Sequence, residues 1–164
     1  MLLSGVDSIA RHVVARLGRT LDLSWAAIAL HPSPLYHWGI QPDGWADRPG
    51  ELHPLLVALA EAAASPPSPY VTRIVPLVAD GATIGLLGVG PKRHNLELSP
   101  DDTALLDTVG PLVATALQNA LLVRGLEAQV EMLGERERAL AALSAQFMGA
   151  HEEERRRLTL DLHD

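Results

Sequence analysis

The spacing of apolar residues changes twice along the chain and divides it into three stretches. In residues 1–24, apolar side chains recur every three or four positions, and this period predicts one amphipathic helix. Ser4 is a candidate N-cap of this helix and Gly18 a candidate stop. The stripe consists of Leu3, Val6, Ile9, Val13 and Leu17.

Residues 25–98 lose the helical period and predict short strands joined by turns. Two apolar runs, at 25–31 and 35–40, are separated by Pro32-Ser33-Pro34 and predict a hairpin. The runs at 70–79 and 82–90 flank Asp80-Gly81, which is the stronger hairpin signal.

Three further positions refine this middle stretch. Pro76 lies inside the first run of the second hairpin, so it is expected at a sheet edge or a bulge. Gly85 and Gly88 in the second run indicate close backbone approach or bends. The Ala- and Leu-rich residues 52–64 predict a helix that ends before a proline-rich segment.

The third stretch predicts one long helix. Ser99-Pro100-Asp101-Asp102 places a capping serine, a proline at the first helical position and two acids in the first turn. No strong breaker follows Pro111, so a helix over 100–164 would be about 95 Å long at 1.5 Å per residue. A helix that extends far beyond the domain it belongs to needs a partner helix, and we expect the partner to be the same helix of a second copy of the chain.

The apolar residues of this helix indicate a coiled-coil seam. Leu126, Val130, Leu133 and Leu140 fit steps of four, three and seven, after which Leu143 and Phe147 continue three residues early and Glu137 occupies the skipped core position. Such a change of phase is typical of a stutter or stammer. It fits an imperfect coiled coil with one polar core position, or a weak joint that passes rotation or sliding between two packings.

Composition narrows the class of protein. The chain has 164 residues, 48% of them hydrophobic, and a net charge of −7, which argues against a nucleic-acid-binding surface. It has no cysteine, which excludes disulfides, Cys-ligated zinc and thiol nucleophiles. No apolar run of about 18–20 residues and no basic signal-peptide region is evident, so we expect no membrane segment and a cytoplasmic protein.

The middle stretch and the start of the long helix carry a first resemblance. The residues are Leu77, Asp80-Gly81, Ile84-Gly85-Leu86-Leu87-Gly88-Val89-Gly90, Leu98-Ser99-Pro100-Asp101-Asp102, Leu105-Leu106, Val113-Ala114 and Ala116-Leu117-Gln118-Asn119-Ala120. They resemble the central hairpin and last helix of a GAF domain. The resemblance implies an α+β fold, an antiparallel sheet flanked by helices, over residues 1–124. It also implies that the first and last helices pack together, often across a homodimer.

The last residues carry a second resemblance. Glu154, Arg155, Arg157, Leu158, Asp161, Leu162, His163 and Asp164 match the phosphoacceptor box Glu-Arg-x-Arg-Ile/Leu-Ala-Arg-Asp/Glu-Leu-His-Asp of histidine kinases that pair with NarL-type response regulators. Thr159 and Leu160 depart from it. The resemblance implies a coiled-coil signalling helix over 125–150 and the first part of the phosphoacceptor box over 151–164.

The chemistry of phosphoryl transfer fits this pair of residues. Attack on the γ-phosphate of ATP needs a neutral, exposed imidazole in line with it, and histidine is mostly neutral near pH 7. A neighbouring carboxylate can accept the ring proton as general base. The resemblance implies that His163 is the phosphoacceptor and Asp164 the base. The alternative is a histidine and an aspartate at a solvated helix end without chemistry.

The same family continues with a glutamine and an ATP-binding domain, and neither motif occurs in these 164 residues. We therefore expect a sensor fragment, inactive alone, with ATP and Mg²⁺ bound by a kinase domain that these residues do not include. No phosphate-binding loop of the Gly-x-x-x-x-Gly-Lys type occurs either. The runs Glu152–Glu154 and Arg155–Arg157 are expected to pair along the helix surface.

A GAF-like domain would bind its ligand between the sheet and a covering lid. Candidate lid residues are Tyr36, His37, Trp38, Trp45 and His53. Trp38 and Trp45 also suit core or dimer anchors, and His37 and His53 suit surface or hydrogen-bonded histidines without a ligand. We expect no haem, no metal and no covalently attached bilin, which would need a cysteine. A purely structural domain without a ligand is an alternative. The alternative function is a non-enzymatic GAF dimerisation or small-ligand-binding module with another output.

Overall fold

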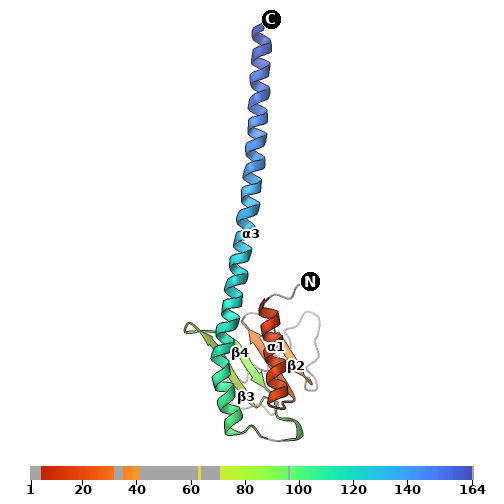
Figure 1. The fold of residues 1–164 in the computed structure, drawn as a ribbon, viewed down its shortest axis with the longest axis vertical. Helices are drawn as coiled ribbons and strands as arrows, with labels where there is room; N and C mark the ends of the chain where they lie inside the picture. The colour runs from red at the N-terminus through yellow and green to blue at the C-terminus, as the bar shows by residue number, and fades with distance from the viewer. Residues whose placement is uncertain (1–4, 32–34, 41–62, 64–70, 96, 164) are drawn as a thin grey trace. The chain divides into compact units, whose positions relative to one another are not determined.

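The computed structural model describes residues 5–31, 35–40, 63, 71–95 and 97–163. Contacts divide the chain into two compact units, Met1–Leu122 and Val123–Asp164. The described elements are α1 (Gly5–Thr20), β1 (Trp25–Leu30), β2 (Leu35–Gly39), β3 (Arg73–Ala79), β4 (Ala82–Val89), the short helix η1 (Arg93–Asn95) and α3 (Pro100–His163). They confirm an α+β fold (Figure 1).

The sheet is antiparallel throughout and its strand order is β2-β1-β4-β3. Both predicted hairpins are confirmed, with Ile28 opposite Tyr36 in the first and Val75 opposite Leu87 in the second. Asp80 and Gly81 have φ angles of 50° and 77°. Positive φ at both turn residues is the geometry that matches the right-handed twist of the flanking strands.

The predicted positions of Pro76 and Gly85 are also confirmed. Pro76 lies in β3, an edge strand, and is followed by a register shift between Leu77 and Val78. The backbone of β1 approaches Gly85 closely, since a Cβ there would lie 2.4 Å from the Ala29 carbonyl oxygen. Any side chain at this position would push β1 and β4 apart.

The main core lies between one face of the sheet and two helices. α1 and the first turns of α3 cover the same face, as Figure 1 shows. From α3, the residues Leu106, Val113, Ala114 and Leu117 are buried there, and from α1 the residues Val6, Ala10, Val14 and Leu17. The opposite sheet face carries a second buried cluster of Trp25, Ala27, Ala29 and Val71. β1 is therefore buried on both faces, which explains its uninterrupted apolar sequence.

The end of α1 differs from the prediction. The helix continues through Gly18 to Thr20, and Asp22, with a φ of 52°, turns the chain. The Leu23 amide then donates to the Gly18 carbonyl at 2.8 Å, which is the six-to-one bond of a Schellman cap. Gly18 serves packing instead, because a Cβ there would lie 2.0 Å from ring carbons of Trp38.

The start of α3 confirms the predicted cap. The Asp102 amide donates to Ser99 Oγ at 3.1 Å, and the Ser99 amide donates to Asp102 Oδ2 at 2.9 Å. This reciprocal pair satisfies two amides at the helix start, as in a capping box. α3 is 64 residues long in all, from Pro100 to His163. The helix predicted at 52–64 lies outside the described residues, apart from Ala63.

In the described ranges, α3 is the one helix long and apolar enough to cross a membrane, by length and composition alone. Its most apolar window has a mean hydropathy of 1.3, and 28% of that window is buried within the protein. Core helices of soluble proteins meet the same criterion, and α3 supplies four residues named above to the core. The hydropathy of α3 therefore favours neither a membrane nor an aqueous environment for this helix.

The contact between Gly18 and Trp38 predicts a large effect from a single methyl group. We expect Gly18→Ala to lower the free energy of unfolding by about 1–3 kcal/mol, because the Trp38 ring must shift. Gly5→Ala in the same helix is the matched control: its Cβ would meet only Ala120 at 3.9 Å, so the change should stay under about 1 kcal/mol. Urea unfolding followed by tryptophan fluorescence measures both, and equal effects would contradict the packing argument.

Candidate functional site

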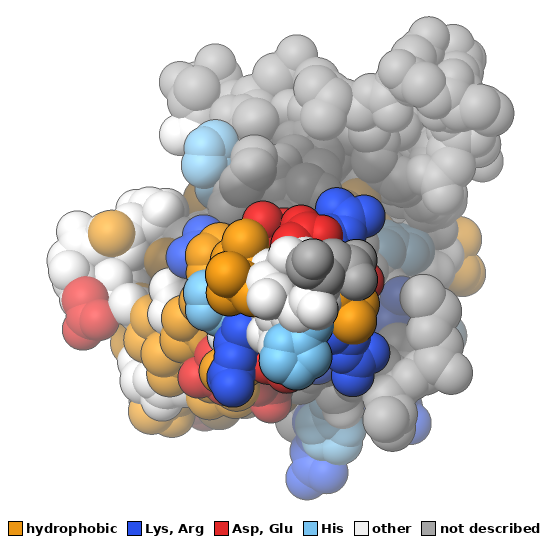
Figure 2. Space-filling view, turned by 90° about the horizontal axis from the view of Figure 1, so that it is seen from above, with side chains coloured by type: hydrophobic (Ala, Val, Ile, Leu, Met, Phe, Trp, Pro, Cys, Tyr) orange, Lys and Arg blue, Asp and Glu red, His pale blue; other side chains and the backbone are white. Residues whose placement is uncertain are grey.

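The C-terminal part of α3 presents its side chains to solvent. His163 is exposed, as are Leu158 at 56% and Leu162 at 86% of their surface. Leu158 and Leu162 are four residues apart and share a helix face, and His163 follows about 100° further round. Asp164, the predicted general base, lies outside the described residues. Viewed from above, the end of α3 mixes hydrophobic, charged and histidine side chains around its surface (Figure 2).

The charged residues before His163 are also exposed. Glu152–Glu154 and Arg155–Arg157 lie consecutively on α3. Within residues 151–163 no ion pair joins the two runs, and the one side-chain hydrogen bond found there runs from Thr159 Oγ1 to the Arg155 carbonyl at 2.9 Å. The expected pairing along the helix surface is therefore not formed in this conformation.

Two of the candidate lid residues lie beneath α1. Tyr36 is 4% exposed, and its hydroxyl donates to Asp7 Oδ1 at 2.5 Å. Trp38 packs on Gly18, and the Arg93 guanidinium lies over its ring at 5.5 Å from the centroid. Both side chains therefore belong to the face of the sheet that the helices cover.

The other candidate lid residues do not join them. His37 alternates to the opposite face of β2 and is paired in register with Ala27, a residue of the second buried cluster. Trp45 and His53 lie outside the described residues. The three described candidates thus lie on two faces of one strand and do not converge on one cavity. Among the described side chains, no group of three His, Cys, Asp or Glu residues is placed to hold a metal ion.

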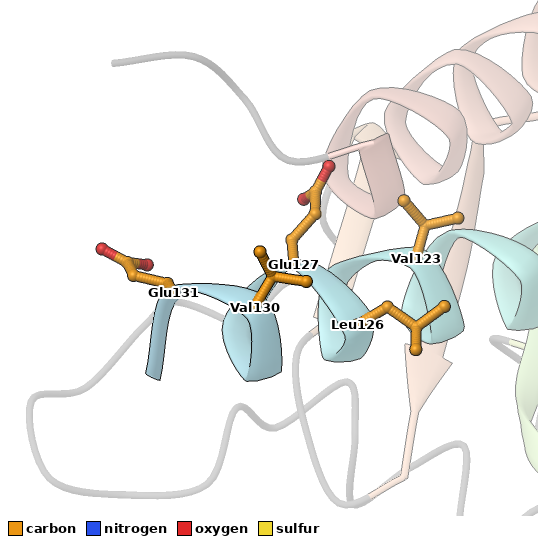
Figure 3. Close-up of a pocket in the computed structure, with 5 residues that line it drawn as sticks. All are labelled: Val123, Leu126, Glu127, Val130 and Glu131. Atoms are coloured by element: carbon orange, nitrogen blue, oxygen red, sulfur yellow. The ribbon is translucent and has the colours of Figure 1, made fainter. Parts of the chain in front are cut away.

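An apolar hollow lies further along α3 and was only partly anticipated. It is lined by Val123, Leu126, Glu127, Val130 and Glu131 (Figure 3). Leu126 and Val130 belong to the predicted seam, whereas Val123 and the two glutamates do not. The spacing of three, four and seven residues from Val123 is the sequence signal that could have identified this face.

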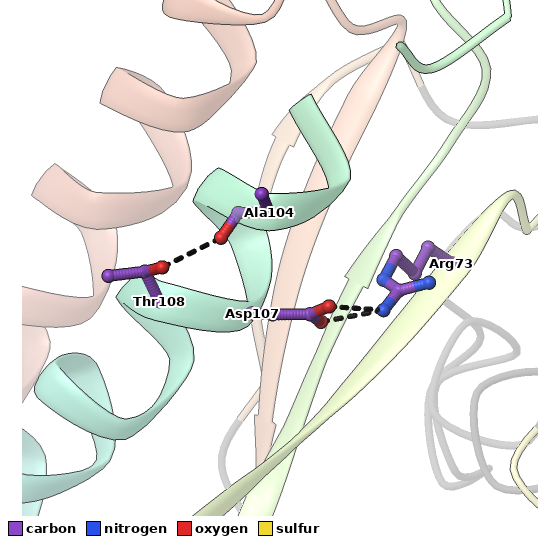
Figure 4. A network of polar contacts seen from close by, with 4 residues as sticks. All are labelled: Arg73, Ala104, Asp107 and Thr108. Carbon is purple, nitrogen blue, oxygen red and sulfur yellow. Dashed lines mark hydrogen bonds and ion pairs between the residues drawn. The ribbon is translucent and has the colours of Figure 1, made fainter. Parts of the chain in front are cut away.

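Polar contacts tie the start of α3 to the sheet, and sequence reasoning missed their partners. Arg73 at the start of β3 donates Nη2 to both carboxylate oxygens of Asp107, at 2.6 and 2.7 Å (Figure 4). Gln118 Nε2 donates to Asp80 Oδ2 at 2.8 Å, at the other end of β3. The two contacts are eleven residues apart on α3, or about three turns, and join the helix to the two ends of β3.

A third polar contact between α3 and the rest of the folded unit is a partly buried ion pair at the start of the helix. Lys92 Nζ lies 2.6 Å from Asp102 Oδ2, and the two side chains are 18% and 15% exposed. The hydrogen bond from Lys92, followed by the Ser99 amide and hydroxyl, holds the pKa of the Asp102 carboxyl below its usual value, although burial acts in the opposite direction. Asp102 was predicted as an acid of the first turn, but its cation lies ten residues earlier and across a loop.

Comparison with known proteins adds no family assignment: the chain matches no protein-family model and no curated protein.

The lowered pKa of Asp102 predicts a pH-dependent contribution to stability. Because the folded-state pKa lies below the unfolded value of about 3.9, the contribution is complete above that value and is lost as the pH falls through the folded pKa. We expect Asp102→Asn to cost about 1–2 kcal/mol at pH 7, where the charged hydrogen bonds are present, and progressively less below pH ~4. Urea unfolding across this pH range measures the difference.

Asp101→Asn is the control for this measurement, since Asp101 is exposed and its side chain has no hydrogen bond or ion pair with any described residue. Its effect should be small at every pH. A loss from Asp102→Asn that is the same at pH 3 and pH 7 would show that the carboxylate charge contributes nothing.

Proposed function

We propose that this chain is the sensory and dimerising part of a two-component sensor histidine kinase, with His163 as the phosphoacceptor. The observation that best supports this proposal is that one helix both contributes to the core of the folded unit and bears an exposed histidine near its end. A phosphoacceptor must be reachable by a separate catalytic domain, so exposure is a requirement of the reaction. The box around His163 supplies the residue types that the chemistry needs.

A GAF-like sensor domain is part of the proposal. It is supported by the antiparallel order β2-β1-β4-β3 and by the packing of the first helix and α3 on one sheet face. In a GAF-like domain the ligand would bind on the side of the opposite face, where the small residues Ala27 and Ala29 are buried in the second cluster. His37 is the candidate lid residue on that side, whereas Tyr36 and Trp38 serve as packing residues beneath α1.

The reaction assigns separate tasks to the two terminal residues. His163 would attack the γ-phosphorus of ATP through a neutral ring nitrogen, and the bond from that phosphorus to the β–γ bridging oxygen would break, so that ADP leaves. Asp164 would accept the proton from the other ring nitrogen as the new bond forms. ATP and Mg²⁺ would be bound by a kinase domain that these residues do not include. The phosphoryl group would then pass to an aspartate of a NarL-type response regulator. The neighbouring Leu158 and Leu162 would pack in the helical bundle of the phosphoacceptor domain.

The alternative is a non-enzymatic GAF-like dimer or small-ligand-binding module. In that case α3 would lead to another output, and His163 would be a surface histidine. The exposed apolar residues of α3 fit this alternative as well as the kinase, because both need a second helix. Only the behaviour of His163 separates the two.

Phosphate labelling of the natural full-length protein tests the proposal. With [γ-³²P]ATP and Mg²⁺ we expect label that is stable in alkali and lost in acid, as for phosphohistidine, and we expect His163→Gln to abolish it. Asp164→Asn should slow labelling by about 10²-fold, the typical contribution of a general base.

His151→Gln is the matched control, because His151 is an exposed histidine of the same helix, twelve residues earlier. It should retain full labelling. Label that persists in His163→Gln, or a natural protein that takes up no phosphate, would refute the phosphoacceptor and leave the dimerisation module.

A further inference from the structure

Helix α3 has a proline in its interior, within the part that packs on the sheet. Pro111 has no amide hydrogen, so the Asp107 carbonyl loses the donor that an unbroken α-helix would supply. On either side of this gap a threonine hydroxyl donates to the carbonyl four residues earlier, Thr108 Oγ1 to Ala104 at 2.8 Å (Figure 4) and Thr115 Oγ1 to Pro111 at 3.0 Å. Both features make a helix easier to bend.

The residues around the proline set the direction in which α3 can bend. Pro111 is exposed, whereas Gly110 is buried against β3, where an added Cβ would lie 2.6 Å from Val75 Cγ1. A helix that bends at a proline keeps the proline on its convex side, and bent helices are convex toward solvent. The bend therefore curves α3 around the core, so that Leu117, which is buried further along the helix, need not leave it.

Two polar contacts join α3 to the ends of β3, one on each side of Pro111. Before the proline, Asp107 pairs with Arg73 through both carboxylate oxygens. After the proline, Gln118 donates one hydrogen bond to Asp80, in the turn that follows the strand. The first contact joins two opposite charges, whereas the second is a single bond from a neutral amide to one charge. The second contact is therefore the easier one to break.

The strand between these two contacts is irregular as well. β3 contains Pro76, and its register with β4 shifts between Leu77 and Val78. A β-bulge of this kind disrupts the ladder locally and changes the twist of the strands. Strand and helix are therefore both irregular between the same two polar contacts, where each can change shape more easily than a regular element.

We propose that Gly110-Pro111 is a hinge in α3, and that the hydrogen bond from Gln118 to Asp80 holds the helix in its observed direction. When that bond is released, the part of the helix after Pro111 changes direction. The part before it stays on the sheet, because Asp107 remains paired with Arg73. The weaker of the two contacts thus controls the hinge.

The opposite face of the sheet can act on this hinge through β3. Ile74 packs against the second buried cluster, and its neighbour Val75 lies against Gly110 on the core face. A change on the opposite face, such as the binding of a ligand, would therefore reach the hinge through one strand. The hinge is a property of the folded unit, and only its effect on His163 rests on the proposed function.

Hydrogen–deuterium exchange tests the weak point in the helix. Pro111→Ala restores one amide, so the amides of residues 112–115 should exchange about 10-fold more slowly relative to those of β1, the effect of one added hydrogen bond. Pro100→Ala is the matched control, because Pro100 is the first residue of the same helix, where an amide has no helical partner. Equal slowing by both variants, or none by Pro111→Ala, would overturn the inference.

Paired spin labels test the contact that holds the hinge, since a chain without cysteine accepts labels at chosen positions. A large excess of unlabelled chain restricts the measurement to distances within one chain. Labels at the exposed positions Arg16 and Leu122 span the hinge, and labels at Arg16 and the exposed Ala104 do not. Gln118→Ala should widen the first distance distribution and leave the second unchanged. Asn119→Ala, at the adjacent exposed residue, is the control and should widen neither.

The double variant Pro111→Ala with Gln118→Ala separates a hinge from general loosening of the helix. Without the proline, the distance distribution from Arg16 to Leu122 should return to its original width, although the bond to Asp80 is still absent. A distribution that stays wide, or no widening by Gln118→Ala alone, would overturn the inference. Failure of this test with phosphate labelling of His163 intact would refute the hinge and leave the proposed phosphoacceptor standing.

Discussion

The burial of one face of α3 against the sheet is the interaction on which the folded unit depends. Leu106 and Leu117 are fully buried, together with Ala114, and they close the core that α1 begins. At roughly 25 cal/mol per Å² of apolar surface, each of the two buried leucines stabilises the fold by about 1.5–3 kcal/mol. Without α3, the sheet would expose the face beneath it, since α1 packs chiefly over β1 and β2.

Apolar packing holds α3 against the sheet, closely enough that a Cβ at Gly110 would lie 2.6 Å from Val75 Cγ1, and three polar contacts add to it. Arg73 with Asp107 and Asp80 with Gln118 hold the helix at the two ends of β3. Lys92 with Asp102 holds its first turn. Any signal that moves α3 relative to the sheet would have to alter these contacts, because each has a directional geometry that tolerates little sliding.

The apolar residues of α3 before and after residue 122 differ in their contacts, and this difference connects structure with function. In the first unit its apolar residues have partners within the chain. In the second unit Leu126, Leu133, Leu140 and Phe147 have none among the described residues, and their seven-residue spacing favours another helix. A parallel dimer through these residues would bring two copies of His163 to the same level of two helices.

Local patterns in the sequence determined most of the described fold. The apolar period predicted α1, Asp80-Gly81 predicted the second hairpin, and Ser99-Pro100 predicted the start of α3. Each of these features depends on residues that are close to one another in the chain. The prediction that Gly18 ends the first helix was wrong, because it too used only nearby residues. A glycine near a helix end has the same local sequence whether it ends the helix or makes room for the ring of Trp38, a residue from a strand. The exposure of His163 also followed from local spacing, since neighbouring residues on one helix settle it.

Only the tertiary structure decided which residues meet across the fold. The sequence grouped Tyr36, His37 and Trp38 as one candidate lid, but strand alternation and the position of α1 place them on two faces. It contained Lys92 and Asp102 without indicating that they pair, because that contact depends on the path of the loop between them. The hollow at Val123 likewise depends on a continuous helix past residue 122. Local spacing therefore determined the elements, and long-range packing determined their partners.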